Sequence, residues 1–578
     1  MSRQSGSFQR GDAYIDLGIV LLLLLLPLLL FAPVALGSKT LLPADSVFVF
    51  EPYRAAASDL GVAFPHNHLV ADLILENYVW KRFLVEALHS RDLPLWDPYI
   101  FAGHPFLANG QHSALYPLSL IFYVLPLWRA YGVFAWLQLG LAGVFAHLLA
   151  RVLGARRLGG LIAGITFQFS GFMLVSVVHP MVIAGASWLP FILAMVELLV
   201  RQRPALGRTP ATLPWALLGA LGLGCQMLAG HAENTYFVLL VTGAFSLWRL
   251  LSSFTHSSST PPSSTHSSFT PSSSTPPPST PPSRIKETST WVDAARRLVR
   301  PVSWLFVMLV LGLALGAVQF VPLVQVVTTS FRGGESAASL QQVLGWAYPW
   351  RRLITFGIPN FFGNPAHHGY FDLFTWRWDP ALTFADGQYI DWGIKNYVEG
   401  GAYLGLLPLF LSAIAILSYV LRPTSHVTRN TQHATRNTPH ASRITHHASR
   451  ITHHASRITF YPIPFFTLLA LFSLGCIFGT PLYALVYALP VIEQSHSPFR
   501  WIFPLTLSVA VLAGFGVEAV QKKSKVQSPI SNLEFPISSS STPPSRSSLC
   551  SLPWPSGLGW PRWSVWVSAA SSSSRSSR

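Results

Sequence analysis

Long apolar runs alternate with polar stretches along most of the chain. An α-helix needs about 20 apolar residues to cross the hydrocarbon core of a bilayer, and ten runs approach or reach that length. They predict transmembrane helices at residues 17–36, 131–152, 158–178, 181–200, 214–230, 234–251, 302–324, 402–421, 460–479 and 501–520. The shorter runs 115–127 and 481–491 predict re-entrant or interfacial segments.

The composition agrees with a membrane protein. Half of the 578 residues are hydrophobic, 11% are charged, and the mean hydropathy is +0.41. This apolar surface exceeds what one soluble core could bury, so we predict an all-α polytopic membrane protein with large external loops after helices one and seven. Cys225, Cys476 and Cys550 are scattered, which excludes a disulfide framework and a CxxC metal site.

The net charge of +16 is explained by the orientation of the protein in the membrane and does not require a nucleic-acid partner. Residues 151–157, 201–208, 249–300 and 422–457 hold 18 basic and two acidic residues, whereas residues 38–115 and 324–400 hold 10 basic and 14 acidic residues. Basic loops stay in the cytoplasm, so both termini are expected there and the protein in the plasma membrane. The basic residues share no single folded face, which argues against nucleic-acid binding.

These features divide the chain into six parts. They are an N-terminal membrane module, 1–251, with external loop 38–115; a Ser/Thr/Pro/His-rich cytoplasmic loop, 252–301; a membrane module, 302–421, with external loop 324–400; a cytoplasmic loop of seven-residue repeats, 422–459; C-terminal transmembrane helices, 460–520; and a low-complexity tail, 521–578. The repeats, such as "SRITHHA", lack the apolar seam of a coiled coil.

Candidate chemistry lies in the external loops, which hold the substantial non-repetitive polar sequence. Asp72 and Glu76 are four residues apart on a predicted helix and would share one face. Two close carboxylates raise one pKa, which suits a general base, and they could hold Mg²⁺ or Mn²⁺. An ordinary solvated helix face remains the alternative. The external histidines lack the spacing of a zinc site.

A second candidate is the stretch "DLPLWDPYIFAGHPFLANGQHSALYPL", residues 92–118. Its polar side chains suit sugar hydroxyls and its aromatic rings offer faces on which a sugar can pack. The candidate substrate-binding residues of this stretch are His104, Asn109, Gln111, His112, Trp96, Tyr99 and Tyr116, and Glu76 is a further candidate. The alternative is structural, with amides that satisfy the loop backbone and aromatics that form an interfacial belt.

The same stretch, from Ser90, resembles the signature of the YfhO-type bacterial membrane proteins. Asp72, Glu76, Tyr78 and Trp80 match the pattern upstream of that signature, although Glu76 stands where Gln is frequent. Weaker similar pieces are "ASWLPFILA", "GCQMLAGHAENTYF", "QFVPLVQ", "YLGLLPLFL" and "SPFRWIFPLTLSVAVLAGFGVE". The resemblance covers most of residues 15–520 apart from the low-complexity inserts.

That resemblance implies a GT-C-like membrane glycosyltransferase. Such an enzyme would move a sugar from a polyprenyl-phosphate donor to a cell-surface polymer or lipid acceptor on the external face, with Asp72 as the catalytic base. The leaving phosphate needs positive charge. We expect Arg500 to supply it, with Arg351 and Arg352 as alternatives, because a guanidinium matches phosphate oxygens. An interfacial anchor is the competing interpretation of Arg500.

Two other classes of protein fit the sequence. A lipid or polysaccharide transporter, or flippase, would place ionisable residues or broken helices near the bilayer midplane, and the sequence gives little sign of either. A non-catalytic envelope-assembly protein would tolerate the loss of Asp72. The polar loop sequence favours the transferase.

Overall fold

The computed structural model describes residues 4–62, 70–201, 212–257, 289–328, 338–362, 369–372, 376–380, 401–421, 462–489 and 498–526. The described chain is mainly helical and belongs to the compact unit Met1–Lys525. Two short antiparallel ribbons join it, β1 (Trp96–Asp97) with β2 (His104–Pro105), and β3 (Gly369–Asp372) with β4 (Arg377–Pro380). The predicted repeats and the low-complexity tail lie almost wholly outside the described residues.

Several helices of the described chain are long and apolar enough to cross a membrane. Five qualify singly: α6 (Leu127–Leu153), α9 (Pro180–Val200), α11 (Ala232–Ser257), α12 (Ser289–Thr328) and α18 (Ile502–Val526). Two bent pairs raise the number to seven if each is one span: α1 (Gln4–Leu25) with α2 (Leu28–Ala35), and α7 (Arg157–Gln168) with α8 (Gly171–Val175). This confirms the multi-pass α-helical class.

The remaining three predicted spans coincide with shorter apolar helices. These are α10 (Leu213–Leu228), α14 (Leu406–Val420) and α16 (Pro462–Ile477). At 1.5 Å per residue, 16 residues reach only about 24 Å, less than the roughly 30 Å of a hydrocarbon core. The total of ten spans therefore stays a prediction.

Local sequence explains the first bend, and a local cap together with a long-range hydrogen bond accompanies the second. Pro27 separates α1 from α2, where the axis turns by 55°, because proline has no N–H to continue the helical ladder. At the 43° bend after α7, the Ser170 hydroxyl accepts a hydrogen bond from the Met173 N–H and caps α8. The Gly171 N–H donates to the Tyr403 carbonyl at 2.7 Å. Protein groups thus satisfy the broken backbone, as a lipid environment requires.

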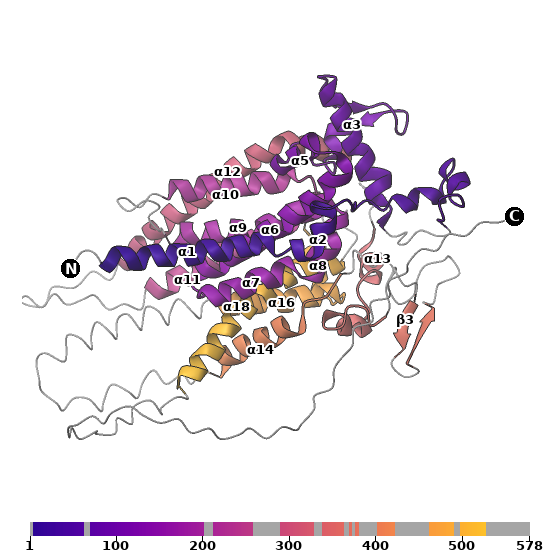
Figure 1. Cartoon of the computed structure of the whole chain (residues 1–578). Coiled ribbons are helices and arrows are strands. Elements are labelled where there is room, and N and C mark those ends of the chain that lie inside the picture. Colours follow the sequence, from indigo (N-terminus) through magenta and orange to yellow (C-terminus); the bar gives the residue numbers. More distant parts are fainter. Residues whose placement is uncertain are drawn as a thin grey trace, which may run out of the picture. The chain divides into compact units, whose positions relative to one another are not determined.

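The helices pack side by side in a bundle (Figure 1). Small residues allow close approach: α10 and α12 meet where Gly219 faces Met308 and Gly316 faces Met227. Among the candidate spans, α18 is the most buried and α12 the least. A large part of α12 is thus left to face lipid.

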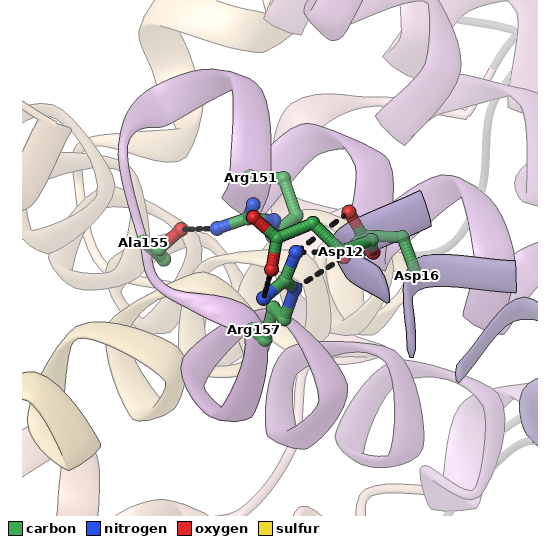
Figure 2. A network of polar contacts seen from close by, with 5 residues as sticks. All are labelled: Asp12, Asp16, Arg151, Ala155 and Arg157. Atoms are coloured by element: carbon green, nitrogen blue, oxygen red, sulfur yellow. Dashed lines mark hydrogen bonds and ion pairs between the residues drawn. The ribbon is translucent and has the colours of Figure 1, made fainter. Parts of the chain in front are cut away.

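An ion-pair network ties α1 to α7 at the end of the bundle that we assign to the cytoplasm. Figure 2 shows the Arg157 guanidinium between the carboxylates of Asp12 and Asp16, with Nε donating to Asp16 at 2.7 Å and Nη1 to Asp12 at 3.0 Å. Arg151 donates to the Ala155 carbonyl at 2.7 Å and closes the α6–α7 turn. The two bent spans are therefore joined through α1 and α7, the helices that precede their bends.

Candidate functional site

The stretch 92–118 is fastened to α10 and α12 near the ends of these helices that the sequence predicts to be external. Gly110 and Gly230 have φ values of +78° and +82°, and a Cβ on Gly230 would lie 1.8 Å from the Gly110 carbonyl oxygen. Only glycines allow this backbone contact. The Ser113 hydroxyl donates to the Ala229 carbonyl at 2.7 Å, and the Gln319 amide of α12 donates to the Leu107 carbonyl at 2.8 Å. The loop thus has a fixed position over the bundle.

A buried lysine holds the loop from its other side. Lys81 lies on α3 (Tyr78–His89) and is fully buried. Its Nζ donates to the His112 carbonyl at 2.5 Å and to the Ser119 hydroxyl at 3.3 Å, and lies 4.3 Å from the centre of the Phe122 ring. Burial lowers the pKa of Lys81 from 10.5 to about 7.

The ring of His112 is a structural element of the loop. Its Nδ1 accepts from the Ala114 N–H at 3.0 Å, so the proton of the neutral ring lies on Nε2, which donates to the Phe106 carbonyl at 3.0 Å. The ring also stacks on Phe106, with centres 4.3 Å apart. Burial, followed by the charge of Lys81, lowers the pKa of His112 to about 3. The ring therefore stays neutral at physiological pH.

Charged and imidazole side chains gather beside this loop at the helix ends that the sequence predicts to be external. Arg500 forms an ion pair with Glu233, the second residue of α11. His179, which precedes α9, lies within electrostatic range of both Asp72 and Arg500. His231, next to the Gly230 contact, lies within range of Arg500 and His179. We call Asp72, His179, His231, Glu233 and Arg500 the outer cluster.

Burial and charge shape titration in and beside the outer cluster. Burial lowers the pKa of His179, and the nearby charges act oppositely, since Asp72 raises it and Arg500 lowers it. Burial, with the charges of Arg500 and His179, lowers the pKa of His231 to about 3. Glu76 is exposed, yet partial desolvation and then repulsion by Asp72 raise its pKa. The expected electrostatic coupling between Asp72 and Glu76 is therefore present.

Two of the predicted sugar-binding residues, Asn109 and Gln111, lie in the part of the loop next to the outer cluster. A third, Tyr116, lies in another part of the loop. Asn109 and Gln111 flank Gly110, whose backbone touches Gly230 beside His231. Gln111 is exposed and Asn109 is partly buried. Tyr116 is 1% exposed, and its hydroxyl shares hydrogen bonds with Gln138 and the Trp188 indole. Its ring has little free face for a sugar, and its visible role is to anchor the loop.

Trp96, Tyr99 and His104 lie on the β1–β2 hairpin. Asp97 pairs with His104 across the ribbon, and Tyr99 meets Phe83 of α3 edge to face. The Trp96 and Tyr99 side chains are 55% and 83% exposed. The described contacts of this hairpin lead to α3 rather than to the outer cluster, so its predicted part in sugar binding rests on exposure alone.

Other basic residues lie near Arg500. Arg352 stacks over the Tyr348 ring, 4.9 Å from its centre, and Tyr348 stacks in turn on Phe499, the neighbour of Arg500. Arg351 instead lies 5.6 Å from the Phe362 ring. Of the two arginines proposed as alternatives to Arg500, Arg352 is thus connected to the neighbour of Arg500 through stacked rings.

The structure offers limited support for a metal site. Over the described residues, no group of three or more His, Cys, Asp or Glu side chains gathers as a metal site would require. Asp72 and Glu76 are thus the whole basis for the expected Mg²⁺ or Mn²⁺.

Sequence reasoning missed the burial of Lys81 and the pairing of Arg500 with Glu233. Lys81 stands beside Trp80 and three residues before Leu84 on the apolar face of α3, and this spacing could have shown that it is buried. No local pattern pairs Glu233 with Arg500, because the two residues lie in distant spans.

Comparison of the chain with protein-family models, curated proteins and solved structures gave no match. The function is therefore argued from the site itself.

Proposed function

We propose that the chain is a membrane glycosyltransferase that moves a sugar from a polyprenyl-phosphate donor to a polymer or lipid acceptor on the external face. One observation carries the proposal. Asp72, from the first external loop, and Arg500, from the last span, both lie within electrostatic range of His179. Two residues predicted separately from the sequence, Asp72 as base and Arg500 as phosphate-binding cation, thus both influence the same histidine, and this supports the proposal.

Each residue has a defined part in the reaction. The Asp72 carboxylate takes the proton of an acceptor hydroxyl, whose oxygen forms a bond to the anomeric carbon while the bond from that carbon to the lipid phosphate oxygen breaks. General-base assistance contributes roughly 10²–10⁴-fold to the rate. Asn109 and Gln111 are placed to donate to sugar hydroxyls.

Arg500 can serve the leaving phosphate although it pairs with Glu233. A guanidinium carries five N–H donors in a planar fork that matches phosphate oxygens. The ion pair also fixes the orientation of Arg500 before the donor arrives, which reduces the entropy lost on binding. Arg352 is the alternative cation.

Complementation of cells that lack the native gene tests the proposal. Surface-polymer sugar is measured by mass spectrometry, with membrane levels matched by immunoblot. We expect Asp72→Asn to reduce the modification at least about 100-fold, the lower end of general-base catalysis. Asp59→Asn, which changes an exposed acid of the same external loop, is the matched control and should restore it. Equal restoration by both variants would refute a catalytic role for Asp72.

The two bent spans favour a second candidate, transport of a lipid or polysaccharide. Broken helices commonly build transporter sites, and the Gln168 amide at the end of α7 is fully buried with both polar atoms unpaired in the described structure. A transporter would move its substrate with Asp72→Asn as well as with wild type. In the same complementation experiment, the amount of lipid or polysaccharide that reaches the cell surface is measured in addition to the sugar attached to the surface polymer. The two measurements separate transport from sugar transfer.

A further inference from the structure

The hairpin of residues 93–105, which we call the aromatic hairpin, lies beside α3 (Figure 1). It carries a dense set of exposed apolar side chains. The exposed fractions are 78% for Leu93, 57% for Leu95, 55% for Trp96, 83% for Tyr99 and 90% for Phe101. Contiguous apolar surface of this kind marks an interaction site, because each exposed apolar Å² costs about 25 cal/mol in water.

The backbone of the aromatic hairpin adopts a strained conformation. Phe101 and Ala102 have φ values of +54° and +58°, a left-handed conformation that costs about 1–2 kcal/mol for each such residue. The Asp97 carboxylate accepts the Tyr99 N–H at 2.9 Å, and the Trp96 ring covers Gly103, where a Cβ would lie 2.5 Å from the indole nitrogen. The strained tip presents Phe101 outward, and such strain is typical of functional segments.

The depth of the aromatic hairpin follows from its attachment to α12. Leu107, two residues beyond the hairpin, accepts a hydrogen bond from Gln319. Gln319 lies five residues before Val324 on α12, which is about 8 Å along a helix. Val321 and Val324, both C-terminal to Gln319, are 56% and 45% exposed. Lipid-facing surface therefore continues outward past the level at which the hairpin is attached.

The aromatic hairpin is also continuous with the lipid-facing side of the bundle. Ile100 of the hairpin and Tyr123 of α5 (Leu120–Val124) pack on the same small core of Trp80, Leu84 and Phe106. Two other residues of α5 are exposed, Leu120 at 61% and Val124 at 71%. α5 leads directly into the span α6, so apolar surface extends from the span through α5 toward the hairpin.

We propose that the aromatic hairpin inserts Trp96, Tyr99 and Phe101 into the outer leaflet of the surrounding membrane. Trp and Tyr prefer the interface because one part of the ring is apolar and another forms hydrogen bonds. A saccharide site would need free polar groups beside the rings. Asp97, the acid of the hairpin, is 1% exposed and already binds the backbone, so apart from His104 and the polar atoms of Trp96 and Tyr99 the hairpin surface around the rings is apolar. This insertion is independent of the transfer reaction.

Spin-label depth measurements test the insertion directly. A nitroxide is attached at Ala102→Cys, which leaves all three aromatic rings in place, in a chain with Cys225, Cys476 and Cys550 changed to Ser. The protein is placed in nanodiscs of phosphatidylethanolamine and phosphatidylglycerol. Accessibility to oxygen and to a water-soluble nickel chelate is compared with that of a label at Glu86→Cys, on the exposed face of α3. We expect an oxygen-to-nickel ratio several-fold higher at position 102.

Adding Tyr99→Ser and Phe101→Ser to the labelled chain should bring the ratio at position 102 to the Glu86→Cys value. Thermal unfolding of each variant shows whether the fold is kept. A ratio at position 102 equal to that at Glu86→Cys would overturn the proposal. So would a label that is immobilised only when envelope polysaccharide is added, which would assign the rings to a saccharide. Neither outcome depends on transferase activity, so the proposed function is tested separately.

Discussion

At the scale of single residues, Lys81 has the most informative environment. Its amino group is fully buried and contacts a carbonyl, a hydroxyl and an aromatic ring. Burying an ammonium without a carboxylate is costly. These contacts fix the position of the loop, because they hold His112 and Ser119, on either side of Tyr116, against α3. Lys81 is thus a positioning residue for the loop that carries Asn109 and Gln111.

This environment predicts a stability that depends on pH. The pKa of Lys81 is about 7 in the folded chain and 10.5 as a free side chain, so between these values the unfolded chain binds more protons. Stability therefore rises with pH across this window, by up to about 1.4 kcal/mol per pH unit. His112 stays neutral throughout and adds nothing. We expect Lys81→Met to lack the rise, because methionine does not titrate.

The measurement is the thermal unfolding temperature in detergent between about pH 7 and pH 10, the window set by the two pKa values. Arg82→Met is the matched control, because Arg82 is the exposed neighbour of Lys81 on α3. It should keep the wild-type slope. Equal slopes for wild type and Lys81→Met would show that Lys81 titrates normally in the folded chain.

At the scale of elements, local pattern predicted the helices well and their contacts poorly. Apolar length locates a span because lipid demands it, so all ten predicted runs contain helices. The bend at Pro27 had a visible signal, but that proline lies within a continuous apolar run. The bend at Ser170 depends on the carbonyl of Tyr403, and the orientation of Arg500 depends on Glu233. Such long-range partners are absent from any local pattern.

The contact between Gly110 and Gly230 gives an element-scale prediction. Gly230→Ala should lower stability by at least about 1–2 kcal/mol from backbone strain alone, and more because its Cβ meets the Gly110 carbonyl oxygen. The loop should be displaced, with faster proteolysis of residues 92–118. Gly243→Ala is the matched control in α11, since nothing lies within 4 Å of its Cβ, and alanine favours a helix. Unfolding temperature and limited proteolysis are measured for both variants. Similar values for the two variants would show that the contact between Gly110 and Gly230 does not hold the loop in place.

At the scale of the whole molecule, the orientation depends on whether the short helices cross. The 15 residues of α14 span about 22 Å as a helix. Residues 401–405 precede it without regular secondary structure, with Ala402 and Leu404 buried. Five residues reach at most about 16 Å, so this segment and the helix together are long enough to cross. If α10 and α16 cross as well, ten crossings place both termini on one side, and the charge pattern makes that side the cytoplasm.

Cysteine labelling tests this topology. In a chain with Cys225, Cys476 and Cys550 changed to Ser, single cysteines are placed at Ser5, Ser90 and Leu421, and intact cells are treated with a membrane-impermeant maleimide. We expect Ser90→Cys to react at once, because its loop is external, and Ser5→Cys and Leu421→Cys to react only after the membrane is permeabilised. Leu421 is 74% exposed at the end of α14, so burial within the protein would not hide it. Labelling of Leu421→Cys in intact cells would mean that α14 enters and leaves on the outer side, and the outer cluster would then lie beneath a re-entrant helix.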